Sequence, residues 1–225
     1  MTTEDGWDQA WDTVFSAREW GRYPPEDLVR FIARSYGGST DRRQVRILEL
    51  GCGPGANLWY LAREGFQVYG VDGSAVAIDR AGQRLAAEGL SADLRVGDVA
   101  RIAASYPPDS FDAIIDIACL QHAALDVRTV LDQAHALLRR GGQMFAMMIA
   151  HGSWGEGLGR KIAPGTYTDV PEGPWIGVGR VHFFTLEEVR AAFSAFEGLR
   201  VEELCVTVNN RRAKIHHWLA YARKL

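Results

Sequence analysis

The sequence has few cysteines, no long apolar run and no strong excess of charge of either sign. Its three cysteines, Cys52, Cys119 and Cys205, lie far apart, which excludes a C-x-x-C zinc motif and a disulfide framework. The longest strongly apolar run, Met144–Ala150, is far shorter than the roughly 20 residues needed to cross a bilayer. The acidic, polar N-terminal residues do not resemble a signal peptide. We therefore expect a cytoplasmic protein, because scattered thiols suit a reducing compartment.

The composition is that of an ordinary globular protein, with 47% hydrophobic and 24% charged residues. The formal net charge of −3 supplies no general field that would attract nucleic acid or an anionic membrane. The 225 residues contain no internal repeat and no low-complexity tract, so we expect one domain over 1–225. We expect a monomer or homodimer with a small-molecule or glycan partner, no nucleic acid and no membrane.

Strands and helices are predicted to alternate along the middle of the chain. The predicted strands cover 45–50, 66–72, 92–98, 111–118 and 143–149, and the predicted helices cover 56–64, 74–88 and 126–138. Strict alternation favours an α/β fold with a mostly parallel, doubly wound sheet and helices on both faces.

The two ends of the chain depart from this alternation. Residues 1–40 predict two helices, the second opened by Pro24 and Pro25. The glycine- and proline-rich stretch 151–180 predicts a long functional loop. A capping box at 185–188 predicts a helix to Phe196, followed by strands over 200–208 and 214–221 joined by a turn at 209–212. We divide the domain into an N-terminal helical part (1–40), a cofactor-binding half (41–150) and a substrate loop with closing strands (151–225).

The most informative motif is ILELGCGPGAN, residues 47–57, followed by Asp72 at the end of the next predicted strand. A glycine-rich turn before a helix allows the backbone to approach a ligand closely, and a carboxylate some 20 residues later is placed to bind ribose hydroxyls. This pattern is compatible with a dinucleotide or with a methionine-bearing adenosine cofactor. A tight turn without a ligand, with Cys52 filling it and Asp72 as a helix cap, is the structural alternative.

Three acidic or turn-forming features favour the methionine-bearing cofactor. Glu49 directly precedes the glycines, where it would repel a pyrophosphate but attract an amino group. Pro54 lies inside the turn and suits a compact ligand. Asp98 ends the third predicted strand, where it can accept a hydrogen bond from an adenine amino group or serve as a plain turn residue.

The order and spacing of several motifs resemble those of class I S-adenosylmethionine-dependent methyltransferases over about residues 40–225. The matching pieces are LELGCGPGAN, GVDGS, GDV, FDAIIDIACLQH, LLRRGGQMF and HFFTLEEV. The resemblance implies a Rossmann-like sheet of seven strands whose last strand is antiparallel. It also implies S-adenosyl-L-methionine as the cofactor and the transfer of its methyl group to an acceptor.

The resemblance assigns roles to cofactor-binding residues. Glu49 and the glycine turn are expected at the methionine part, Asp72 at the ribose, Asp98 and Val99 at the adenine, and the Asp116–Ile117 backbone at the amino group. A lid over residues 18–26 is expected to place aromatic faces near the sulfonium. The residues expected at the cofactor are Glu49, Gly51, Cys52, Gly53, Gly55, Asn57, Asp72, Gly73, Asp98, Val99, Asp116, Ile117, Trp20 and Tyr23.

Three histidines are candidate catalytic bases: His122, His151 and His182. His122 and His151 follow predicted strands at the carboxyl edge of the sheet, where ligands bind in such folds. His182 lies where the family often places substrate contacts. A buried histidine bonded to backbone is the alternative for His122, and packing is the alternative for His182. The pair His216–His217 lies in a predicted strand and neither is favoured.

The sequence indicates less about the methyl acceptor than about the methyl donor. Asp116–Cys119 replaces the NPPY-like motif of nitrogen methylation, and no acidic cluster for a metal is evident. Aromatic residues with Arg18, Arg22, Arg160 and Arg180 predict a small polar or anionic acceptor methylated on oxygen, unless these side chains only pack or face solvent. The candidate acceptor-binding residues are Arg22, His122, Trp154, Arg180 and His182. An N-methyltransferase, a non-catalytic cofactor-binding module and, less favoured, an NAD-dependent oxidoreductase are the alternatives.

Overall fold

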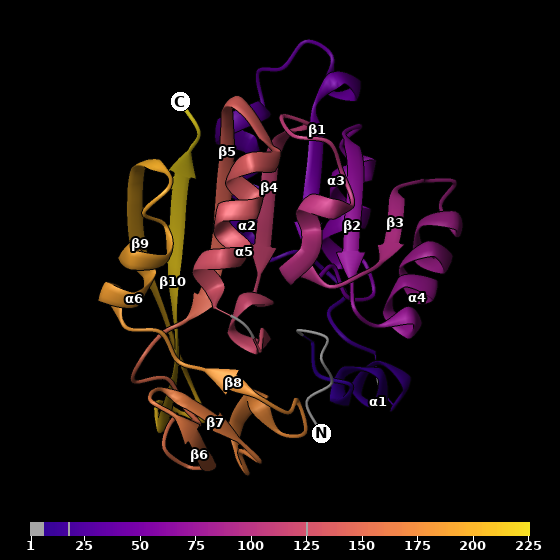
Figure 1. Ribbon diagram of the computed structural model, residues 1–225. Coiled ribbons are helices and arrows are strands. Elements are labelled where there is room, and N and C mark those ends of the chain that lie inside the picture. The colour runs from indigo at the N-terminus through magenta and orange to yellow at the C-terminus, as the bar shows by residue number, and fades with distance from the viewer. Residues whose placement is uncertain (1–6, 18, 125) are drawn as a thin grey trace.

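A seven-stranded sheet forms the centre of the molecule (Figure 1). The computed structural model describes residues 7–17, 19–124 and 126–225. The strands are β1 (Arg46–Leu50), β2 (Gln67–Asp72), β3 (Asp93–Val96), β4 (Phe111–Ile117), β5 (Leu138–Ile149), β9 (Glu197–Val208) and β10 (Ala213–Arg223). Their order is β3-β2-β1-β4-β5-β10-β9, in which β10 is antiparallel to both of its neighbours. The predicted sheet with an antiparallel last strand is confirmed.

Helices cover both faces of this sheet (Figure 1). One face carries α2 (Glu26–Tyr36), α3 (Ala56–Arg63) and α4 (Ala75–Ala86), and the other carries the 3₁₀ segment η2 (Val99–Ala104), α5 (Val127–Leu137) and α6 (Leu186–Ala192). The short helix α1 (Ala10–Ala17) packs beside α4 near the carboxyl ends of the parallel strands. The predicted doubly wound arrangement is therefore present.

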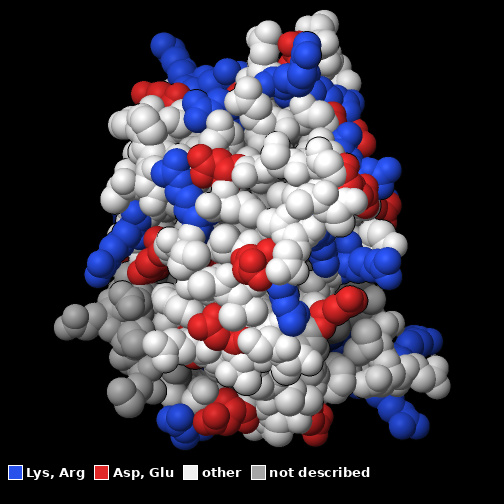
Figure 2. Space-filling model, turned by 90° about the vertical axis from the view of Figure 1, so that its right-hand side faces the viewer, with Lys and Arg blue, Asp and Glu red and all other residues white. Residues whose placement is uncertain are grey.

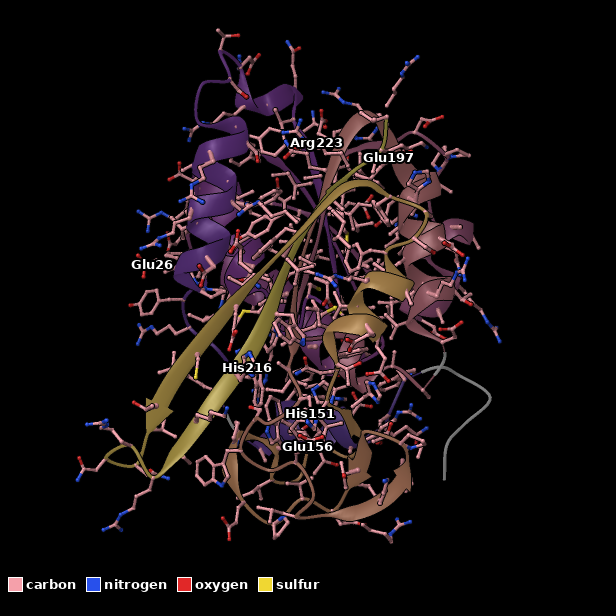
Figure 3. All side chains as sticks on the ribbon, turned by 90° about the vertical axis from the view of Figure 1, so that its left-hand side faces the viewer. Glu26, His151, Glu156, Glu197, His216 and Arg223 are labelled. Carbon is pink, nitrogen blue, oxygen red and sulfur yellow. The ribbon has the colours of Figure 1, made fainter. Side chains whose placement is uncertain are left out.

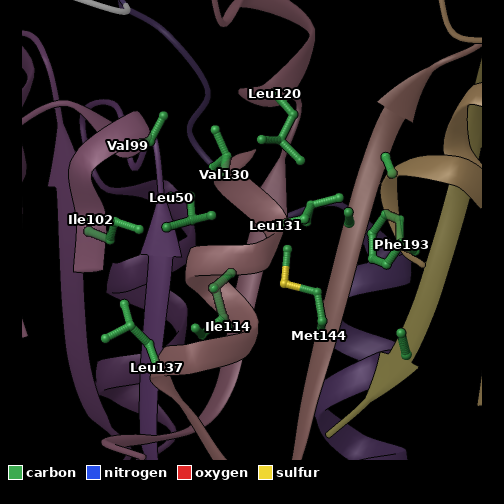
Figure 4. Close-up of a cluster of buried hydrophobic side chains, with 14 of the residues drawn as sticks. Leu50, Val99, Ile102, Ile114, Leu120, Val130, Leu131, Leu137, Met144 and Phe193 are labelled. Carbon is green, nitrogen blue, oxygen red and sulfur yellow. The ribbon is translucent and has the colours of Figure 1, made fainter. Parts of the chain in front are cut away.

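Alternating apolar residues of the central strands build a core on each face. In β4, Ile114 faces the layer of α5, whereas Ala113 and Ile115 face the layer of α2 and α3. Figure 4 shows the first of these cores, in which Leu131 and Met144 are fully buried. Each such side chain contributes about 1.5–3 kcal/mol of apolar burial, which holds the strand ends rigidly in place.

The region after β5 contains a second sheet where a long loop was expected. Strands β6 (Arg160–Ala163), β7 (Thr166–Thr168) and β8 (Val181–His182) form a three-stranded antiparallel sheet. The expectation was wrong because strands of two to four residues are too short to show a period of two. Trp175, Val178 and Phe183 pack this region onto the end of β5. The substrate-loop region is thus a folded layer at the carboxyl edge of the main sheet.

Two predicted boundaries also differ from the structure. The strand β5 begins at Leu138 rather than Gln143, and Gly141 and Gly142 lie inside it instead of ending the preceding helix. A register irregularity between Phe111 and Ala113 accommodates these glycines in the pairing of β4 with β5. The helix α6 ends at Ala192, four residues before the expected end at Phe196.

The surface carries mixed charges. On the face that bears α4 and β3, basic and acidic side chains are interspersed (Figure 2). Across the described residues, no helix has both the length and the apolar character needed to pass through a bilayer.

Candidate functional site

The glycine motif forms a tight turn between β1 and α3. Gly51, Gly53 and Gly55 all have positive φ angles of 51–78°, which favour glycine. A side chain on Gly51 would collide with the Cys119 side chain, and one on Gly55 would come within 2.9 Å of Ala81 Cβ. The turn is therefore pinned between the end of β4 and α4, with its backbone exposed to the adjacent space.

A cavity of about 230 Å³ opens beside this turn. It lies at the carboxyl edge of the parallel strands, where ligands bind in doubly wound folds. Most of the predicted cofactor residues line it: Glu49, Gly51, Cys52, Gly53, Asn57, Asp72, Gly73, Val99, Ile117, Trp20 and Tyr23. The structure thus brings together residues that are up to 97 positions apart in the sequence, from Trp20 to Ile117.

Glu49 is a buried carboxylate with one oxygen unpaired. Only 1% of the residue is exposed, and its Oε1 accepts a hydrogen bond of 2.6 Å from Asn57 Nδ2. Its Oε2 has no hydrogen-bond partner among the described residues. Burial, reinforced by the nearby charges of Asp116 and Asp72, raises the pKa of Glu49 well above its usual value. A donor carrying positive charge would satisfy this oxygen.

Asp72 and Asp116 add two further buried carboxylates to the same edge. Asp72 accepts hydrogen bonds of 2.8 Å from the backbone N–H groups of Gly53 and Ser74, and burial raises its pKa. Asp116 Oδ1 accepts hydrogen bonds from Cys119 N and Leu120 N at 3.1 Å, and burial raises its pKa to about 7. Three acids in one place disfavour a pyrophosphate and favour a cationic ligand.

Residues 47–142 match the family model described as "Methyltransferase domain". The glycine turn, Glu49 and Asp72 all lie in this matched stretch. The matched stretch supports a methyltransferase domain of the class I S-adenosylmethionine-dependent type. The cofactor of this family, S-adenosyl-L-methionine, carries an ammonium and a sulfonium group, which fits the unpaired Glu49 oxygen and the cluster of buried acids.

Individual relatives support the family and its fold. A "Ubiquinone biosynthesis O-methyltransferase" from Sinorhizobium medicae is 30% identical over 146 residues, which cover 62% of this chain and 58% of that protein. A phosphoethanolamine N-methyltransferase from Haemonchus contortus, solved with S-adenosylhomocysteine, has a TM-score of 0.69 at 20% identity and covers 95% of this chain and 57% of that chain. A SAM-dependent methyltransferase from Methanosarcina mazei has a TM-score of 0.63 at 22% identity and covers 80% and 92%. The chain spans 58% of the length of the first relative.

The other predicted cofactor residues, Gly55, Asp98 and Asp116, do not line this cavity. Asp98 caps η2 by accepting a hydrogen bond of 2.9 Å from Ala100 N, and its neighbours Gly97 and Val99 line the cavity in its place. Asp116 holds the turn after β4, whereas Ile117 faces the cavity. Gly55 allows the close approach to α4 and is not part of the lining.

His122 is the one of the three candidate bases that lines the cavity. It lies on the short 3₁₀ segment η3 (Leu120–His122), and its Nδ1 is 2.6 Å from the carbonyl oxygen of Arg180. Since a carbonyl can only accept, Nδ1 carries the proton and Nε2 keeps its lone pair. Burial lowers the pKa of His122 to about 4, so the ring is neutral at ordinary pH. His122 is thus bonded to backbone, as the structural alternative has it, and it also lines the cavity, while its role as a base stays a prediction.

The other two candidate histidines lie elsewhere. The His151 side chain is exposed, and its Nδ1 is 2.8 Å from Glu156 Oε1 (Figure 3). His182 contacts Thr166 Oγ1 through Nδ1 at 2.7 Å and lies 3.5 Å from Glu188 through Nε2. Neither ring lines the cavity beside the glycine turn. Each ring instead contacts residues of the insertion, the region 151–184 between β5 and α6, or of α6 itself.

The predicted acceptor-binding residues are mostly outside this cavity. Arg22 is exposed above the ring of Tyr23, and Arg160 is exposed and pairs with Asp169. Trp154 donates a hydrogen bond of 3.2 Å from its Nε1 to Glu172 Oε2 in the insertion and does not line the cavity. Arg18 lies outside the described residues. Arg180 reaches the His122 ring only through its backbone.

Several lining residues were not foreseen as site residues: Trp7, Asp8, Trp11, Phe15, Gln121 and Val178. Trp11 packs edge-on against His122 at 4.8 Å between ring centroids. Gln121 Oε1 accepts from Ile149 N at 2.9 Å, while its buried Nε2 meets no partner within the described ranges. The helical spacing of Trp7 and Trp11 signalled a packed helix, but only the fold shows that this helix covers the cavity.

Proposed function

We propose that this chain transfers the methyl group of S-adenosyl-L-methionine to an oxygen atom of a small acceptor. The observation that carries the proposal is the neutral His122 ring, whose Nε2 lone pair is available in the same cavity as the unpaired Glu49 oxygen. The relative named as an O-methyltransferase of ubiquinone biosynthesis supports an oxygen acceptor.

In methyl transfer by in-line displacement, the cavity residues would have separate roles. When bound, S-adenosyl-L-methionine supplies an electrophilic methyl group on its sulfonium. Glu49 and Asp72 orient the donor through its charged and hydroxyl groups, and the aromatic rings of Trp11 and Trp20 exclude water. His122 Nε2 removes the proton of the acceptor hydroxyl as the new carbon–oxygen bond forms. His122 would hold the proton of the acceptor as an imidazolium, which carries the positive charge that the cofactor brings.

The lining next to His122 suits an acceptor with a flat or apolar body. Trp11 and Trp175 flank the ring, with centroid distances of 4.8 and 6.3 Å, and Val178 completes this wall. Gln121 Nε2 is the free donor that such an acceptor would meet. We propose a small hydroxylated molecule of this kind, acted on in the cytoplasm, where the three free cysteines would stay reduced.

The test combines cofactor binding with methyl transfer. Calorimetry is expected to show micromolar binding of S-adenosylhomocysteine and no binding of NADH. Labelled S-adenosyl-L-methionine is then incubated with the protein and fractionated metabolites, and the labelled product is treated with base and acid to identify a methyl ether or ester. A labelled amine would show that the acceptor atom is nitrogen and not oxygen. Binding without any labelled product would favour a non-catalytic module.

A further inference from the structure

A second cavity, of about 330 Å³, lies next to the methyltransferase cavity. Its walls come from the start of α5, from β8 and from α6, and Ala123 lines both cavities. The segment Leu120–Ala123 therefore forms the partition between them. We call this space the Arg180 cavity, after the one cation in its lining whose charge no described carboxylate pairs with.

The Arg180 side chain is partly buried, and no described carboxylate forms an ion pair with it. Its Nε is buried and has no hydrogen-bond partner in the described part of the chain. Burial alone lowers the pKa of Arg180, with no contribution from a neighbouring carboxylate. A guanidinium left this way is costly unless an anion completes its hydrogen bonds.

The acidic residues in the same lining are already engaged. Asp126 caps α5 by accepting from Arg128 N at 3.0 Å. Glu188 accepts from the backbone and hydroxyl of Thr185 at 2.7 and 3.0 Å, and its other oxygen faces His182. The remaining cation, Arg128, lies 4.0 Å from Asp132 on its own helix. Among the described residues of this lining, the Arg180 guanidinium is therefore the cation that forms no ion pair, and an anionic ligand would complete it.

The same residue also connects the two cavities. The carbonyl oxygen of Arg180 holds the His122 ring, while its side chain lines the neighbouring space. A molecule lying across Ala123 would present a hydroxyl to His122 and an acidic group to Arg180. A guanidinium fork binds carboxylate and phosphate groups in a fixed orientation, which would also orient that hydroxyl.

We propose that the Arg180 cavity binds a carboxylate or phosphate group of the methyl acceptor itself. This inference rests on the proposed function and narrows its substrate class to hydroxylated acids. It also gives Arg180 two roles: its backbone positions the base, and its side chain binds the acceptor.

The test measures binding rather than turnover. Protein saturated with S-adenosylhomocysteine is titrated by calorimetry with 4-hydroxybenzoate and with 4-methylphenol, which differ in the acidic group. We expect the acid to bind about ten-fold more tightly or better, since a charge-assisted pair is worth this much. Arg180→Met is expected to abolish the difference, and Arg180→Lys to keep part of it. Inorganic phosphate is expected to compete with the acid.

Arg160→Met is the matched control, because Arg160 is an exposed arginine of the same insertion that pairs with Asp169. It should leave both affinities unchanged. Failure of the acid to bind, equal affinities for the pair, or a preference that survives in a folded Arg180→Met variant would overturn the inference. Phosphate that binds through Arg180 without displacing the acid would assign the site to a separate anion and overturn it as well. Loss of S-adenosylhomocysteine binding in the unmodified protein would instead refute the proposed function.

Discussion

At the scale of single residues, buried ionisable groups define the site. Glu49, Asp72 and Asp116 are nearly or fully buried at one edge of the sheet, and the pKa of each is raised by that burial. His122 lines the same cavity as Glu49 and Asp72 and is a neutral ring. The site is thus arranged to gain from a positively charged ligand and to accept one proton.

The affinity for S-adenosylhomocysteine should depend on pH through Glu49. Burial raises the pKa of Glu49 in the free protein, whereas a bound ammonium lowers it by favouring the carboxylate, so binding should be coupled to proton release from Glu49. We expect the affinity to increase as the pH rises, and Glu49→Gln to weaken binding and remove this part of the dependence. Calorimetry in buffers of different ionisation enthalpy measures the released proton directly. An identical pH dependence in Glu49→Gln would contradict the assignment.

Replacement of His122 should lower the turnover number and leave the affinity for the methyl donor unchanged. Loss of a general base lowers kcat by about 100-fold or more. We expect this of His122→Ala, with an unchanged affinity for S-adenosylhomocysteine. Because burial lowers the pKa of His122 to about 4, kcat/KM of the unmodified protein should show no histidine-dependent decrease between about pH 5 and 8. His151→Ala, at the exposed ring paired with Glu156, is the control and should retain full turnover.

At the scale of elements, polar side chains cap the starts of three helices, and the capping box at 185–188 is present as predicted. Ser74 and Asp126 cap α4 and α5, and Thr185 with Glu188 forms a complete capping box at α6. These caps matter for the site, because α5 and α6 both form walls of the Arg180 cavity. By contrast, α1 covers the donor cavity through tertiary contacts, among them the packing of Trp11 on His122.

Removal of the capping box should destabilise the protein modestly. Thr185→Ala loses the hydroxyl that accepts from Glu188 N at 3.2 Å, and we expect a loss of about 1 kcal/mol in the free energy of unfolding. Thr185→Ser keeps the hydroxyl and should retain most of the stability. Urea unfolding followed by circular dichroism measures both variants. Equal losses would show that the methyl group of Thr185, not the cap, is responsible.

At the scale of the whole molecule, burial of titratable groups makes stability depend on pH in two opposing ways. Burial lowers the pKa values of His122 and His217 to about 4, so the unfolded chain binds more protons than the fold between about pH 4 and 6.5. Their contribution is complete above pH 6.5 and is lost as the pH falls. Asp116, whose pKa is raised to about 7, acts in the opposite direction over an overlapping range.

The variant His217→Asn separates the contribution of His217 to this pH dependence from those of the other buried groups. His217→Asn cannot be protonated, so its free energy of unfolding should fall less than that of the unmodified protein when the pH is lowered from about 6.5 to 4. The difference should approach about 3 kcal/mol, since each unit of pKa shift corresponds to about 1.4 kcal/mol. Chemical unfolding at several pH values gives both curves. Parallel curves would show that His217 titrates alike in the folded and unfolded chain.

The sequence by itself determined the architecture and the donor. Hydrophobic periodicity, capping residues and the glycine turn are local signals, so the parallel sheet, most of its helices and the cavity around Glu49 and Asp72 follow from them. The short strands of the insertion carried too few residues to show a period. Asp98 caps the 3₁₀ segment η2, as a side chain that can cap a turn does, and its contact with adenine stays a prediction.

Only the tertiary structure decided how the distant residues meet. Three histidines were equivalent candidates along the chain, and the packing of Trp11 and the carbonyl of Arg180 bring His122 alone into the cavity. Arg22 and Arg180 were both predicted at the acceptor, but the fold exposes Arg22 and buries part of Arg180, whose Nε has no partner among the described residues. The burial of a side chain and its hydrogen-bond or ion-pair partners depend on contacts between segments far apart in the sequence. These contacts determine which charged side chain has no ion-pair partner and which ring is placed to accept a proton.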